Sequence, residues 1–126
     1  MMDLKHFRQI NDRFGHQVGD ELLVKFGEVL QKQDDDTLSC RIGGDEFCLF
    51  YKEAIDTKEL ELMAEKILSE FQQKTAGEKY AEITSVSFGI ARILESSDRK
   101  FEQLYSNADK DLYVEKNRSN NDWYIL

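Results

Sequence analysis

Hydrophobic residues recur at helical spacing in several stretches of the chain. The spacing follows the 3.6-residue period of an amphipathic helix, with polar residues between the apolar ones. Four helices are predicted, over residues 5–14, 18–32, 56–74 and 101–113.

Residues at the predicted helix ends support these assignments. Gly15 follows the first stretch and is typical of a helix C-terminus. Asp20 and Glu21 are expected in the first turn of the second helix, where negative charge is favourable. Asp56 or Thr57 is expected to open the third helix, with a carboxylate at Glu59 or Glu61 as its capping partner.

Other stretches show strand patterns. Leu38–Ile42 and Phe47–Tyr51 are β-prone and are separated by Gly43, Gly44 and Asp45, where the glycine pair can supply the positive φ angles of a tight turn. Residues 82–93 alternate between large and small side chains and predict a central strand, and residues 123–126 a final one. The order of elements indicates an α/β sandwich, a mostly antiparallel sheet flanked by helices.

Length and composition indicate one domain. The chain has 126 residues, 40% of them hydrophobic, and contains no proline, internal repeat or low-complexity segment that would mark a linker. Because no apolar run reaches the length of a membrane span and no secretion signal is recognisable, we expect a cytoplasmic protein without membrane association. Cys40 and Cys48 are expected to remain thiols.

The charge balance narrows the possible ligands. The formal net charge is −8, which argues against a surface that tracks nucleic acid. A phosphate ligand would therefore be small and locally held. The run Asp34–Asp36 is interpreted as a solvated loop.

Acidic residues at the hairpin suggest a metal site. Asp45 and Glu46 alone would be ordinary turn residues. Asp3, however, follows two methionines and precedes a helix, a position at which a strand presents a side chain at a sheet edge. If that strand lies beside the hairpin, the three carboxylates converge, and Mg²⁺ binds such groups together with substrate phosphates and water.

The motifs of the chain resemble a known family. "DLKHFRQINDRFGHQVGDELL" and "RIGGDEF" are similar to the D-x-D-x-F-K-x-x-N-D-x-x-G-H-x-x-G-D and R-x-G-G-D-E-F text of GGDEF diguanylate cyclases, and "VSFGIA" and "NADKDLYVEK" match later family segments. The resemblance covers residues 3 to about 121. It implies a fold like the palm of class III nucleotidyl cyclases.

The resemblance also implies an activity. Two GTP molecules, one on each protomer of a homodimer, would be condensed into cyclic di-GMP with release of two pyrophosphates, supported by Mg²⁺ or Mn²⁺. In this family such a domain is commonly joined to a sensory domain.

Site roles follow from the same resemblance. Asp3, the Leu4 carbonyl and Asp45 match metal ligands, and Glu46 matches the catalytic carboxylate, either as a further ligand or as a base. Asp45 and Glu46 together form the predicted catalytic pair. The matched substrate-binding positions are Asn11 and Asp20 for guanine, and Phe7, Arg8, Gly43, Gly44 and Lys116 for the phosphates.

The sequence departs from the family pattern at several positions. Lys5 replaces the second aspartate of D-x-D, and Asn120 replaces a phosphate-binding arginine. Asp34 and Thr37 stand where the inhibitory product site has arginine and aspartate, so no feedback inhibition is expected through that site. The domain, residues 1–126, lacks most of the usual first strand and the segment before it. An alternative therefore stays open, a degenerate module that binds GTP or a partner protein without catalysis.

Overall fold

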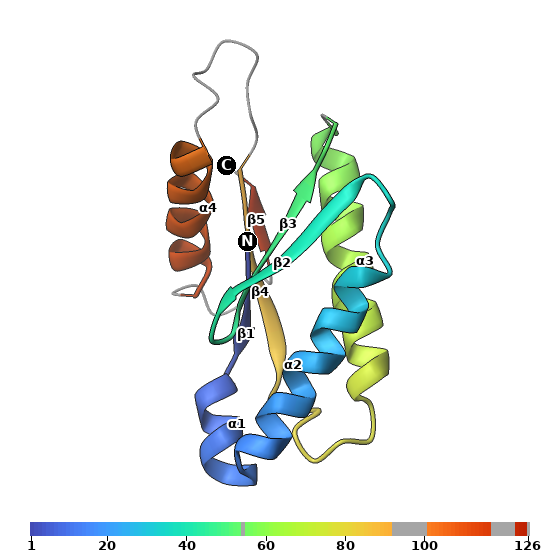
Figure 1. Ribbon diagram of the computed structural model, residues 1–126, viewed down its shortest axis with the longest axis vertical. Coiled ribbons are helices and arrows are strands. Elements are labelled where there is room, and N and C mark those ends of the chain that lie inside the picture. Colours follow the sequence, from blue (N-terminus) through green and yellow to red (C-terminus); the bar gives the residue numbers. More distant parts are fainter. Residues whose placement is uncertain (54, 92–100, 117–122, 126) are drawn as a thin grey trace.

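A five-stranded sheet with helices on both faces forms the domain. The computed structural model describes residues 1–53, 55–91, 101–116 and 123–125. The elements along the chain are β1 (Met2–Lys5), α1 (Phe7–Phe14), α2 (His16–Gln31), β2 (Thr37–Gly43), β3 (Glu46–Tyr51), α3 (Thr57–Thr75), β4 (Ser85–Ile90), α4 (Phe101–Lys116) and β5 (Trp123–Ile125). The predicted α/β architecture is confirmed (Figure 1).

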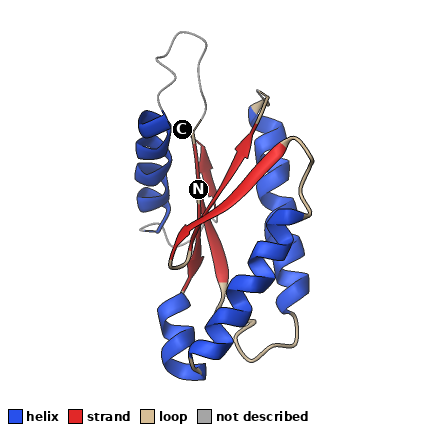
Figure 2. Ribbon diagram, viewed as in Figure 1, coloured by secondary structure: helices blue, strands red, loops and turns tan. Residues whose placement is uncertain are grey.

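The strand order places β1 at the centre of the sheet. The order is β2-β3-β1-β4-β5, with β1 antiparallel to both β3 and β4. Only β5 runs parallel to its neighbour among the described pairs, so the sheet is mostly antiparallel as expected. Helices α2 and α3 cover one face and α4 the other, as Figure 2 shows.

The hydrophobic core lies between the sheet and the α2–α3 layer. Along each strand, successive side chains point to opposite faces of the sheet, and directly paired residues on neighbouring strands point to the same face. Alternate residues of β3, β1 and β4 therefore point into this core. Phe26 of α2 is fully buried, and its ring meets Phe47 and Phe71 edge-on at centroid distances of 4.9 Å and 5.1 Å. The strands contribute Met2, Leu4, Phe47, Val86 and Phe88 to this core.

The boundaries agree with the sequence patterns except at α2 and β4. Helix α2 begins at His16, immediately after Gly15, so Asp20 lies beyond its first turn; the prediction of acidic residues in that turn was wrong. Strand β4 begins only at Ser85, because residues 76–84 form turns after α3. Predicted strand residues 92 and 93, and residue 126 at the end of the chain, lie outside the described residues.

The predicted cap of α3 is present. The Asp56 carboxylate accepts a hydrogen bond from the Glu59 N–H at 2.8 Å, and the Glu59 carboxylate accepts one from the Asp56 N–H at 3.0 Å. This reciprocal pair satisfies donors that the first turn of a helix leaves free. None of the helices in the described ranges is long and apolar enough to cross a bilayer.

Candidate active site

Two predicted site residues face each other across the centre of the sheet. Asp3 of β1 is the direct partner of Glu46 of β3, and on its other side Asp3 is the partner of Ser87 of β4. The three side chains therefore form a row on the face of the sheet covered by α4. Asp3 is buried, Glu46 is half-buried, and Ser87 is fully buried.

The hairpin tip brings the main chain of Asp45 beside β1. The Asp45 carbonyl accepts a hydrogen bond from the Leu4 N–H at 3.2 Å, which ties the tip to β1. Arg41 of β2 stabilises the turn, because its Nε donates a hydrogen bond to the Gly44 carbonyl at 2.9 Å. Gly44 has a φ of 55° in the left-handed region, whereas Gly43 belongs to β2, so only one glycine of the pair supplies a positive φ.

The main chain thus brings β1 and the tip of the β2–β3 hairpin together, as predicted. Leu4 is 1% exposed and its side chain belongs to the core, so only its main chain is available to a ligand. Within the described residues, no group of three or more His, Cys, Asp or Glu side chains is arranged to hold a metal ion. Asp3, Asp45 and Glu46 therefore do not form a ready-made three-carboxylate cage.

The start of α1 lies beside β1. His6 adopts a left-handed conformation with a φ of 59° and makes the turn from the strand into the helix. Phe7 packs partly against the core, while Arg8 is exposed. The positive end of the helix and the Arg8 guanidinium are features that favour an anion.

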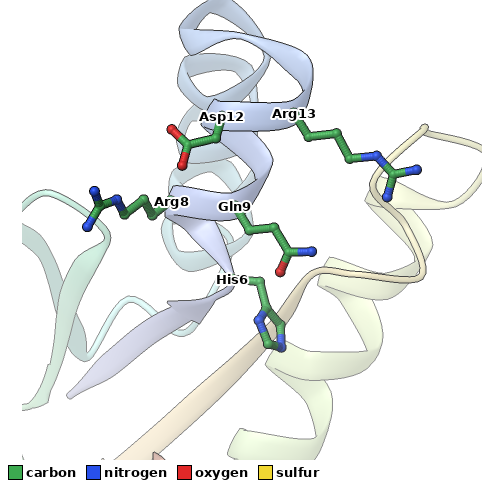
Figure 3. Close-up of a pocket in the computed structure, with 5 residues that line it drawn as sticks. All are labelled: His6, Arg8, Gln9, Asp12 and Arg13. Atoms are coloured by element: carbon green, nitrogen blue, oxygen red, sulfur yellow. The ribbon is translucent and has the colours of Figure 1, made fainter.

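A shallow hollow of about 650 Å³ lies along the exposed side of this helix. It is lined by His6, Arg8, Gln9, Asp12 and Arg13. Figure 3 shows Arg8 and Asp12 on one side of α1 and Gln9 and Arg13 on the other. Arg8 is the only predicted site residue in the lining, so the hollow is not centred on the acidic row.

The two predicted guanine-binding residues lie on adjoining helices. Asn11 of α1 is half-buried, and its side-chain oxygen is buried without a hydrogen-bond partner in the described part of the chain. Asp20 of α2 is exposed. Lys116 is the last residue of α4; its side chain lies outside the described residues, as do Arg118 and Asn120.

Comparison with known proteins identifies the family. The family model described as "Diguanylate cyclase, GGDEF domain" matches residues 1–122. The chain belongs to the GGDEF family.

Relatives of this GGDEF domain include proteins named as diguanylate cyclases. The diguanylate cyclase DgcS of Shewanella oneidensis is 34% identical over 117 residues, which are 92% of this chain and 38% of DgcS. The GGDEF domain therefore spans well under half the length of that relative.

Solved structures share the fold. An EAL/GGDEF domain protein from M. capsulatus is 36% identical with a TM-score of 0.82, covering 98% of this chain and 80% of the other. The GGDEF domain of DgcB from Caulobacter crescentus, in complex with c-di-GMP, is 25% identical with a TM-score of 0.83, covering 98% and 74%.

Sequence reasoning missed two residues next to the GGDEF acidic row. Burial and then the negative charge of Glu46 raise the pKa of the Tyr105 phenol, so α4 brings a neutral hydroxyl close to that carboxylate. Ser87 was noted only as a small residue of a strand, yet its hydroxyl is buried beside Asp3 with no hydrogen-bond partner among the described residues. Neither could be found from spacing, because both depend on strand register and helix placement.

Proposed function

We propose that this GGDEF domain is a diguanylate cyclase that condenses two GTP molecules into cyclic di-GMP and two pyrophosphates. The observation that supports it best is the row formed by Glu46, Asp3 and Ser87, with Asp45 joined to the same strand. Its family membership and the c-di-GMP complex of DgcB support the choice of substrate and product.

The donor atoms of the row fit Mg²⁺ or Mn²⁺. Mg²⁺ commonly uses one or two protein carboxylates and completes its coordination with water and substrate phosphates, so a three-carboxylate cage is unnecessary. Asp3 together with Glu46 or Asp45 would supply the carboxylate ligands, with the Leu4 carbonyl as a further ligand. When bound, the ion would lower the pKa of the attacking hydroxyl and offset charge on the triphosphate.

The side chains and main-chain amides of the site would orient two GTP molecules, one bound to each protomer, for reaction with each other. The 3′-hydroxyl oxygen of one GTP bonds to the α-phosphorus of the other, the bond from that phosphorus to the bridging oxygen breaks, and pyrophosphate leaves. Glu46 or Asp45 would accept the hydroxyl proton. The phosphates would be bound by Arg8, the first amides of α1, Gly43, Gly44 and Lys116. Guanine would be bound by Asn11 and Asp20, because its N1 and N2 hydrogens suit a carboxylate acceptor.

Lys5, a basic residue at the second aspartate position of the D-x-D pattern, favours a second function. Lys5 stands on β1 two residues after Asp3, where the family pattern has an aspartate. The alternative is a domain that binds GTP or a partner protein without turnover.

Incubation with GTP and Mg²⁺, followed by chromatography of the products, tests both functions. We expect cyclic di-GMP from the wild type, with a rate that rises more than linearly with protein concentration because two protomers must meet. Glu46→Gln and Asp45→Ala should abolish product, whereas Glu65→Gln, an exposed position on α3, should not. GTP binding without product would favour the alternative. Absence of Mg²⁺-dependent GTP binding would overturn the cyclase and would leave, of the alternative, only the binding of a partner protein.

A further inference from the structure

Gly19 of α2 lies directly against the Asn11 side chain of α1. A β-carbon at position 19 would lie 1.8 Å from Asn11 Oδ1 and 2.8 Å from Asn11 Cγ. Both distances are far below van der Waals contact. No side chain at position 19 is compatible with this conformation of Asn11.

The main chain at Gly19 does not itself require glycine. Gly19 donates a helical hydrogen bond to the Gly15 carbonyl at 3.3 Å, and it is not among the glycines with positive φ. Glycine within a helix costs roughly 1 kcal/mol relative to alanine. The reason for glycine here is therefore the space that its missing side chain leaves.

The group that fills this space has unused hydrogen-bonding capacity. Asn11 Oδ1 is buried and has no hydrogen-bond partner in the part of the chain that the structure describes. Buried polar atoms in folded proteins nearly always have a partner. The amide is thus placed by the packing of its oxygen against Gly19, while Asn11 as a whole is only half-buried.

We propose that Gly19 is a positioning residue for nucleotide selection: its missing side chain leaves the space that orients the Asn11 amide toward the guanine base. The proposal rests on the proposed function, in which Asn11 contacts guanine. A methyl group at position 19 would push the Asn11 side chain into another rotamer. Because only a flexible side-chain end has to move, the fold should survive the change.

The same helix offers a matched control. Gly27 also lies within α2, and a β-carbon there would meet no atom within 4 Å. Gly19→Ala and Gly27→Ala are therefore the same chemical change in the same helix. They differ in whether a neighbouring side chain must move.

Calorimetry with GTP and with ATP, in the presence of Mg²⁺, tests the proposal. We expect Gly19→Ala to weaken GTP binding by on the order of tenfold, the value of about one hydrogen bond, and to leave ATP binding unchanged. Gly27→Ala should bind both nucleotides like the wild type. Both variants should have melting temperatures at or above that of the wild type.

A double variant shows whether Gly19 acts through Asn11. In an Asn11→Ala background the clashing atoms are gone, so adding Gly19→Ala should fold and should cause no further loss of GTP affinity. A further loss there, or wild-type GTP affinity in Gly19→Ala, would overturn this proposal alone. If the wild type binds no GTP, the proposed function fails and this proposal fails with it.

Discussion

Asp3 and Glu46 are direct partners across the antiparallel β1–β3 ladder. Side chains in such a pair have β-carbons about 5 Å apart, and like charges directly opposite one another are destabilising. A divalent cation between the two carboxylates would offset that repulsion. In the proposed metal site, this pair would link the stability of the domain to metal binding.

Mg²⁺ should stabilise the wild type against heat. A ligand that binds only the folded state raises the free energy of unfolding, and each kcal/mol corresponds to about 4 °C in a domain of this size. Asp3→Asn and Glu46→Gln should reduce the rise, measured by thermal denaturation with Mg²⁺ or with a chelator. Glu65→Gln serves as the exposed control. An equal rise in melting temperature in all four proteins would show that Mg²⁺ does not bind at this row.

Phe26 should dominate the stability of the core. Its ring is fully buried against Phe47 and Phe71, so Phe26→Ala removes contacts between α2, the sheet and α3 together. We expect a loss of about 3–5 kcal/mol in the free energy of unfolding, measured by urea denaturation. Val24→Ala on the same helix should change it little, because Val24 is 60% exposed. Comparable losses for the two variants would contradict the described packing.

Alkaline pH should destabilise the domain through Cys48. Burial raises the pKa of its thiol from 9.0 to about 11, and Cys40 on β2 lies directly opposite. Between these values the unfolded state has released the proton and the folded state has not. The free energy of unfolding should therefore be unaffected by this group below pH 9 and should fall as the pH rises toward 11.

Comparison with Cys48→Ala isolates that effect. The variant should lose less stability than the wild type between pH 8 and pH 11, by on the order of 2 kcal/mol. Other groups titrate in this range in both proteins, so the difference between the two pH profiles is the relevant quantity. Parallel profiles would show that the Cys48 thiol is not protected by burial.

Removal of the α3 cap should have a modest and specific cost. Asp56→Ala leaves the Glu59 N–H without its acceptor, and we expect a loss of about 1 kcal/mol in urea denaturation. Asp56→Asn should retain most of the stability, because asparagine is an equally good N-cap residue. A large loss with Asp56→Asn would mean that charge, rather than hydrogen bonding, stabilises this end of the helix.

The sequence by itself determined the local structure. Helical periodicity, the capping residues of α3 and the glycine turn depend on interactions over a few residues, and the corresponding elements formed within a few positions of the predicted ends. The start of α2 was predicted too late in the sequence, and this error also has a local cause. Gly15 ends α1, and α2 begins at the next residue. The motif spacing was sufficient to identify the family.

Tertiary structure alone decided which side chains meet. The row of Glu46, Asp3 and Ser87 depends on the register of three strands that are distant in the sequence, and a shift by one residue would turn each side chain to the other face of the sheet. The contact of Asn11 with Gly19 likewise depends on how α1 docks on α2. Periodicity specifies which face of an element is apolar, but register and docking are set by the packing of the whole core, so neither relationship could be read from spacing.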